Sequence, residues 1–107
     1  MRITALLGAA AGVLAVATGV RAAGLTIEQS GQQFSQKSAA VGVGDSIVFA
    51  NHDDVTHNIN VINEDDDAAD LGLQKPGASL TYKFDKAGRF KVRCSIHPSM
   101  KLSVSVK

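Results

Sequence analysis

The C-terminal third of the chain alternates apolar and polar side chains every two residues, and this pattern constrains the fold more than any other feature. Three segments show it, each with its apolar residues on alternate positions: Leu80–Phe84, Phe90–Cys94 and Leu102–Val106. Successive side chains along a β-strand point to opposite faces of its sheet. Each segment therefore predicts a strand with one face in a core and the other in water.

Shorter apolar segments, separated by clusters of Gly, Asn and Asp, predict the earlier strands. These strands are Leu25–Glu28, Ala39–Val43, Ser46–Ala50 and His57–Ile62. Asp85–Gly88 predicts a hairpin turn between the first two C-terminal strands, and Cys94–Met100 predicts the connection to the third. The least determined stretch is Asn63–Gly72, where a short helical turn is predicted around Ala68–Leu71. About seven to eight strands at this spacing predict an all-β fold, a two-sheet Greek-key sandwich.

The N-terminal segment has the layout of a secretory signal. Ile3–Val20 is almost entirely Ala, Val, Leu, Gly and Ile, and Arg2 precedes it. Small residues before a cut after Ala22 predict a signal peptide over 1–22 and a single domain over 23–107. The domain is then expected in the periplasm or otherwise exported, with no membrane span after cleavage. An uncleaved anchor is the alternative, since the stretch approaches the roughly 18 to 20 residues that cross a bilayer.

The charge of the expected domain argues against nucleic-acid binding. Two of the eleven Lys and Arg residues, Arg2 and Arg21, lie in the leader, which leaves nine basic against ten acidic side chains. Strong nucleic-acid affinity needs a basic surface. Acidic residues nevertheless gather in the middle of the chain and basic residues follow late: Asp53, Asp54, Glu64–Asp67 and Asp70, then Lys83, Lys86, Arg89, Lys91, Arg93, Lys101 and Lys107. Such a dipole could orient a partner, although solvation alone accounts for most of these charges.

Four residues form a pattern that suits a metal. His57 is in phase with Ile59, so its ring is expected to point inward, and Cys94 ends an inward-facing set. His97 and Met100 follow Cys94 at steps of three residues. A trigonal site of two His and one Cys with a weak axial Met is the blue-copper arrangement. Zinc could use the same ligands, but a structural zinc site normally has four strong donors. One copper ion is the prediction.

Each ligand candidate also has an ordinary structural interpretation. A single His is usually hydrogen-bonded in the core, a buried Cys is a small hydrophobic residue, and a Met fills space. The metal interpretation depends on finding all of them together. A structural sandwich with a coincidental pattern stays open as an alternative. His52, in an acidic loop, is predicted to be solvent-exposed and not to be a second metal ligand.

The segments Asn51–Asn58, Pro76-Gly77 and Ala87–Met100 resemble the cupredoxin (type 1 blue-copper) family. Within the family the chain is amicyanin- and plastocyanin-like. Its short Cys-x2-His-x2-Met loop is similar to that of amicyanin, whereas plastocyanin and pseudoazurin have a longer gap between His and Met. The resemblance covers essentially all of 23–107. It implies a cupredoxin sandwich, a type 1 copper site and one-electron transfer. It also implies the roles of individual residues: His57, Cys94, His97 and Met100 as ligands, and Asn58 as a brace between the ligand strand and the copper loop.

Ile96 departs from the family pattern, because amicyanin, plastocyanin and pseudoazurin have a proline there. Ile96 keeps an N–H that proline lacks. We hypothesise that this N–H donates a second hydrogen bond to the Cys94 sulfur and raises the reduction potential.

The expected function is one-electron transfer between redox protein partners by a monomer. Similarity to amicyanin raises a dehydrogenase and a c-type cytochrome as partners, although docking surfaces vary within a fold. A copper carrier or buffer with the same ligands is the alternative. An enzyme such as a multicopper oxidase or a copper nitrite reductase is not expected, because it needs further His clusters and the chain has three His residues.

Overall fold

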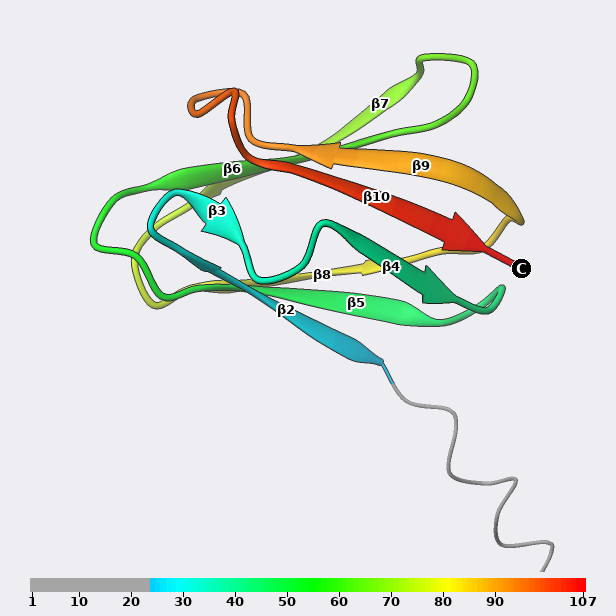
Figure 1. The fold of residues 1–107 in the computed structure, drawn as a ribbon, viewed down its shortest axis with the longest axis horizontal. Coiled ribbons are helices and arrows are strands. Elements are labelled where there is room, and N and C mark those ends of the chain that lie inside the picture. The colour runs from blue at the N-terminus through cyan, green and yellow to red at the C-terminus, as the bar shows by residue number, and fades with distance from the viewer. Residues whose placement is uncertain (1–23) are drawn as a thin grey trace, which may run out of the picture.

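Alternating side chains build nine β-strands in residues 24–107, the part of the chain that the computed structural model describes (Figure 1). The strands are β2 (Leu25–Ser30), β3 (Gln33–Phe34), β4 (Ser38–Val41), β5 (Ser46–Asn51), β6 (His57–Ile62), β7 (Ala68–Gln74), β8 (Ser79–Lys83), β9 (Gly88–Arg93) and β10 (Lys101–Val106). The all-β prediction is confirmed. The two-residue β3 and the strand β7 were not predicted. The predicted signal peptide, 1–22, lies outside the described residues. Within those residues, no helix is long and apolar enough to cross a membrane.

The strands form two sheets that pack face to face. One sheet has the order β4-β10-β9-β6-β7 and the other the order β3-β2-β5-β8. Two pairs are parallel, β10 with β4 and β2 with β5, and the others are antiparallel. The inward-facing residues of both sheets form one core together with Phe84, Cys94 and Met100 from the adjoining segments. The core residues in the strands are Ile27, Phe34, Ile47, Phe49, Ile59, Val61, Val92, Leu102, Val104 and Val106. This sandwich is the fold that the alternation predicted.

The hairpin prediction at Asp85–Gly88 is wrong. The strands on either side, β8 and β9, belong to different sheets, so this segment carries the chain across the sandwich. Phe84 explains the crossing, because it is 1% exposed and its ring packs edge-on against that of Phe90 at 5.2 Å. Phe84 thus packs in the core at the point where the chain leaves one sheet and enters the other, and this contact joins the two sheets. The predicted connection Cys94–Met100 does join two paired strands, β9 and β10.

The short helical turn predicted around Ala68–Leu71 is also wrong, because these residues begin β7, which pairs with β6. A β-bulge hid the strand from the sequence pattern. The pairing register shifts between Ile59 and Asn60 of β6, and Gly72 on β7 adopts a φ of 94° at this point. One extra residue in a strand reverses the order of inward and outward positions beyond it. The period of two is therefore lost over the seven residues of β7.

The topology gathers several loops at one end of the sandwich. The strands β6 and β9 are antiparallel neighbours, with Asn60 opposite Arg93. The first residue of β6 and the residue after β9 therefore lie at the same end of the sheet, beside the β9–β10 loop (Figure 1). The β2–β3 turn reaches this end too, because the amides of Gly31 and Gln32 donate to Asp53 in the loop before β6.

Candidate metal centre

His57 and Cys94 are fixed by neighbouring strands of the five-stranded sheet. His57 begins β6 and is fully buried, and Cys94 directly follows β9 and is 2% exposed. His97 follows three residues later in the β9–β10 loop and is half-buried. The two imidazole rings meet edge to face, with centroids 4.9 Å apart. The structure thus brings together three residues that the sequence singled out.

The three donor atoms form a compact triangle. His57 Nδ1 lies 3.1 Å from His97 Nδ1, and Cys94 Sγ lies 3.9 Å and 3.7 Å from these two nitrogens. A point in the plane of this triangle lies about 2.1 Å from all three atoms, within the roughly 2.0–2.3 Å typical of metal–nitrogen and metal–sulfur bonds. No side chain has to move to surround an ion, so the residues present fit a trigonal metal site.

Met100 lies at the end of the same loop. Its amide donates to the carbonyl of His97 at 3.0 Å, which closes a turn. The Met100 side chain is fully buried and belongs to the core. A blue-copper site takes a weak thioether as its axial ligand, and a buried Met at the end of the metal loop is a candidate for that role. The assignment of Met100 as a ligand stays a prediction.

A carboxylate that the sequence analysis missed orients His57. Asp53 Oδ2 lies 2.7 Å from His57 Nε2, and its side chain is 10% exposed. A ligand imidazole commonly donates its second ring N–H to a carboxylate, which fixes the tautomer. Because an ionised carboxylate only accepts hydrogen bonds, Nε2–H is the donor to Asp53, and in the neutral ring Nδ1 is then left with the lone pair that a metal needs. The one sequence signal for this contact was that Asp53 lies four residues before His57 in the chain.

Asp53 is held in place by a tight turn between β2 and β3. Its Oδ1 accepts from the amide of Gly31 at 2.6 Å, and its Oδ2 accepts from the amide of Gln32 at 2.9 Å. Both turn residues have positive φ, 63° and 58°, which is the geometry of a type I′ hairpin turn. The turn therefore directs two adjacent N–H groups at one carboxylate.

These contacts lower the pKa of Asp53. Desolvation is the largest single influence and would raise that pKa, because burial penalises the charged form. The hydrogen bonds from Gln32, His57 and Gly31, together with the charge of His57, act in the opposite direction and outweigh it. The pKa of Asp53 is therefore lower than that of an ordinary aspartate, and the carboxylate is ionised at neutral pH.

Asn58 links the ligand strand to the metal loop. Its backbone N–H donates to Cys94 Sγ at 3.3 Å, and its Oδ1 accepts from the amide of Ser95 at 3.1 Å. Its Nδ2 donates to Asp70 Oδ1 at 2.9 Å. These are the contacts that the proposed brace requires. Among the described residues, Asn58 supplies the amide that bonds to the sulfur, so a second bond from Ile96 stays a prediction.

His52 lies apart from the triangle. Its side chain is 59% exposed, and its Nε2 is 3.9 Å from Glu28 Oε2. The prediction that His52 is exposed is confirmed. In residues 24–107, the cluster able to hold a metal consists of His57, Cys94 and His97.

Residues 22–107 match the family model described as copper binding proteins, plastocyanin/azurin family. The chain belongs to this family. The donor set and the family together identify copper as the cofactor of this cupredoxin. Cupredoxins of this kind carry electrons, and this chain shares that general role.

Curated relatives of this cupredoxin include two methylamine utilization proteins MauL. The protein from Methylorubrum extorquens is 38% identical over 64 residues, which cover 60% of this chain and 56% of the relative. The protein from Methylophilus methylotrophus is 34% identical over 65 residues, covering 59% of this chain and 37% of the relative. The match thus spans about half of the MauL proteins or less. Plastocyanin from Vicia faba is 34% identical over 84 residues, 68% of this chain and 84% of that one.

Solved structures of amicyanin share the fold of this cupredoxin. A reduced tryptophan-to-tyrosine mutant of amicyanin superimposes with a TM-score of 0.73 at 22% identity, covering 85% of this chain and 89% of that one. A methionine-to-alanine mutant of amicyanin with Cu(I) superimposes with a TM-score of 0.72 at 20% identity, covering 78% and 82%. At such identities the similarity establishes the sandwich fold.

Proposed function

We propose that this cupredoxin is exported to the periplasm, where it passes single electrons between redox proteins while one copper ion cycles between Cu(I) and Cu(II). The observation that carries the proposal is the triangle of His57, Cys94 and His97, whose three donor atoms surround one point at bonding distance. We assign Met100 as the axial ligand. The bound copper supplies the one-electron chemistry, and the protein supplies the binding site and its orientation.

The protein's contribution is a ligand set that is held still. Asp53 fixes the ring of His57, and Asn58 fixes Cys94 through its amide and the loop through Ser95. His57 and Cys94 extend from strands whose side chains fill the core. A cage that changes little between oxidation states leaves little to rearrange when an electron moves. Fast electron exchange therefore follows from the rigidity of these supports.

His97 is the proposed port for electrons, because it is the ligand nearest to solvent. It is half-buried, whereas Ile96, Pro98 and Ser99 beside it are exposed. A small surface of this kind suits brief docking, since transient redox complexes have small interfaces. The MauL relatives are named for methylamine utilization. We propose a dehydrogenase as the electron donor and a c-type cytochrome as the acceptor.

The accessibility of His97 also favours a second candidate, a copper carrier or buffer. A half-buried ligand in a loop could release the metal to an acceptor without unfolding the sandwich. The two functions differ in how fast the protein releases copper. A redox carrier keeps copper in both oxidation states, whereas a copper carrier transfers Cu(I) rapidly to an acceptor.

The visible and EPR spectra of the protein after Cu(II) addition test the proposal. An intense sulfur-to-copper charge-transfer band with a narrow copper hyperfine splitting is expected. Cys94→Ser should abolish the band, and His52→Ala, a change at the exposed histidine, should leave it intact. Spectra of ordinary tetragonal copper, or rapid loss of Cu(I) to a chelator, would instead favour the carrier function.

A further inference from the structure

Four cationic side chains line the outer face of the five-stranded sheet. Arg89, Lys91 and Arg93 occupy alternate positions of β9 and are exposed, while Phe90 and Val92 between them face the core. Lys101, on β10, lies directly opposite Arg93 in the pairing register and is also exposed. We call these four residues, Arg89, Lys91, Arg93 and Lys101, the basic stripe.

The basic stripe has no acidic partner within residues 24–107. The ion pairs found there are His52–Glu28, His57–Asp53 and Lys83–Asp85, and none includes a residue of the stripe. Positive charges lined up along one strand repel each other. Arg93 and Lys101 lie directly opposite each other on neighbouring strands, and a like-charge pair in that position destabilises the isolated protein. An acidic partner would relieve this repulsion.

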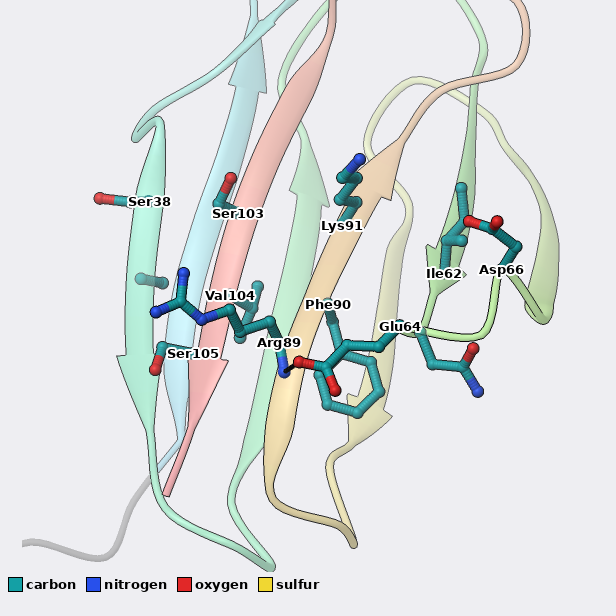
Figure 2. A pocket seen from close by; sticks show the side chains of 12 residues that line it. Ser38, Ile62, Glu64, Asp66, Arg89, Phe90, Lys91, Ser103, Val104 and Ser105 are labelled. Carbon is teal, nitrogen blue, oxygen red and sulfur yellow. Dashed lines mark hydrogen bonds between the residues drawn. The ribbon is translucent and has the colours of Figure 1, made fainter.

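The surface beside the stripe is hollowed. A shallow depression of about 560 Å³ lies on this face, and Figure 2 shows Arg89 reaching across it above β10. The serines Ser38, Ser103 and Ser105 lie along its β4 and β10 side, and Lys91 stands above it on β9. Guanidinium, ammonium and hydroxyl groups are all donors for carboxylates. The depression is therefore suited to acidic side chains projecting from another molecule.

An acidic loop bounds the same face on its other side. Glu64 and Asp66 line the opposite edge of the depression, between β6 and β7. Glu64 Oε2 accepts from the backbone amide of Arg89 at 3.3 Å, so its carboxylate contacts the β9 backbone and leaves the Arg89 guanidinium free. The face is thus divided into a positive and a negative half. This division favours one orientation of a partner whose charges complement both halves.

We propose that the basic stripe is the docking surface for an acidic patch on the redox protein partner. This inference rests on the proposed electron-transfer function and names the chemistry of the partner. Arg93 directly precedes the ligand Cys94 in the chain, so one end of the stripe reaches the metal loop. The divided charge favours a protein over a membrane. An anionic bilayer is uniformly negative and would be repelled by Glu64 and Asp66, whereas a protein patch can be confined to the positive half.

A titration with a hexaglutamate peptide tests the docking surface. The probe is added to ¹⁵N-labelled protein, both metal-free and loaded with Cu(I), and amide shifts are followed by NMR. The shifts are expected to concentrate on β9 and β10 and to vanish in about 1 M salt, where the screening length falls to about 3 Å. Replacing Arg89, Lys91 and Arg93 by Gln should weaken peptide binding about tenfold or more, at a few-fold for each exposed charge.

A matched control separates the stripe from net charge. It removes the same number of positive charges from exposed positions outside the stripe: Lys75→Gln, Lys83→Gln and Lys86→Gln. This control should change peptide binding less than about twofold. Equal weakening by both triple variants would overturn the proposal, because binding would then follow net charge alone. Shifts centred away from β9 and β10 would also overturn it.

Two further measurements address other occupants of the stripe. Stripe-dependent binding to phosphatidylglycerol vesicles would overturn the proposal in favour of a membrane surface. A stripe-dependent dimer in sedimentation at low salt would overturn it in favour of a second copy of this chain. The titration needs no electron transfer, so it is independent of the spectroscopic test. If the copper spectra fail while the metal-free protein still binds the peptide at the stripe, the redox function falls and the acidic docking surface stands.

Discussion

Asp53 Oδ2 lies 2.7 Å from His57 Nε2, so the deepest ligand of the metal triangle is oriented by a carboxylate from the loop just before its strand. The carboxylate is in turn held by two amides of the β2–β3 turn in the other sheet. The metal centre therefore depends on contacts between the two sheets. His57 cannot change its tautomer or rotate without breaking this contact.

The first prediction is that Asp53→Asn weakens copper binding about 10- to 100-fold, the usual effect of losing a carboxylate behind a ligand imidazole. An asparagine can still accept from Nε2–H, but its oxygen lacks the charge that strengthens the ring as a donor. Competition with a Cu(I) chelator measures the affinity. Asp54→Asn, at the exposed neighbouring position, is the control and should keep wild-type affinity. Equal affinities in D53N and wild type would contradict the assigned role.

The second prediction concerns the stability of the metal-free protein at acid pH. The folded-state pKa of Asp53 is lowered, so the ionised carboxylate stabilises the fold at any pH above its unfolded pKa of roughly 3.9. This contribution is lost as the pH falls through the lower folded pKa. Urea unfolding midpoints of wild type and D53N should therefore differ at pH 6 and converge below pH 4. A difference that stays constant with pH would show that the ionised carboxylate is not responsible.

The parts of the fold that the sequence predicted are those in which one strand face is buried without interruption. In β9 and β10 the inward residues Val92, Leu102 and Val104 alternate strictly with polar ones, and both strands were found within one or two residues. The sequence singled out two of the candidate ligands for a related reason. His57 and Cys94 continue the inward phase of β6 and β9, so the same alternation that builds the core directs them to one point.

The features that the sequence did not reveal depend on contacts between distant segments. The strand β7 is bulged and includes Asp70 and Gly72, residues that rarely occur in strands, and its pairing with β6 overrides that preference. The crossing at Asp85–Gly88 depends on where Phe84 packs, which a local turn signal does not contain. The role of Asp53 depends on a turn more than twenty residues earlier in the chain.

The third prediction is that Asn58→Ala loosens the metal loop. The change removes the acceptor of the Ser95 amide and the donor to Asp70, and should destabilise the protein by about 1–3 kcal/mol. The backbone bond from residue 58 to Cys94 Sγ does not need the side chain, so copper should still bind. Asn60→Ala removes side-chain bonds without touching the Ser95 amide and serves as the comparison. Denaturant unfolding of both copper-loaded variants should show the larger loss in N58A.

The fourth prediction tests the departure from the family pattern at Ile96. If its amide donates to the Cys94 sulfur in the copper-loaded site, Ile96→Pro removes that donor and should lower the reduction potential, because hydrogen bonds to the thiolate favour Cu(I). Ile96→Ala keeps the amide and is the matched control. Both changes are made at an exposed side chain, so packing losses are small. A potential in I96P equal to or above that of I96A would refute the hypothesis.

The fifth prediction concerns two buried glutamines beneath the metal centre. Gln74 lies opposite His57 in the β6–β7 register, and its Oε1 accepts from Gln29 Nε2 at 3.0 Å. Gln29 Oε1 is the one buried side-chain oxygen or nitrogen in residues 24–107 that has no hydrogen-bond partner. Gln29→Met deletes this unpaired atom while leaving Gln74 Oε1 without its donor, so the number of unpaired atoms stays the same.

Gln74→Met increases the number of unpaired buried atoms. It leaves Gln29 Nε2 unpaired in addition to Gln29 Oε1, and it removes the bonds that Gln74 Nε2 donates to the carbonyls of Phe49 at 2.6 Å and Ala78 at 2.8 Å. An unpaired buried polar group costs about 1–3 kcal/mol. Urea unfolding should therefore show Q74M destabilised by about that amount relative to Q29M. The same comparison would reject this account if Q29M were the less stable variant, because the unpaired oxygen of Gln29 would then have a partner that stabilises the core.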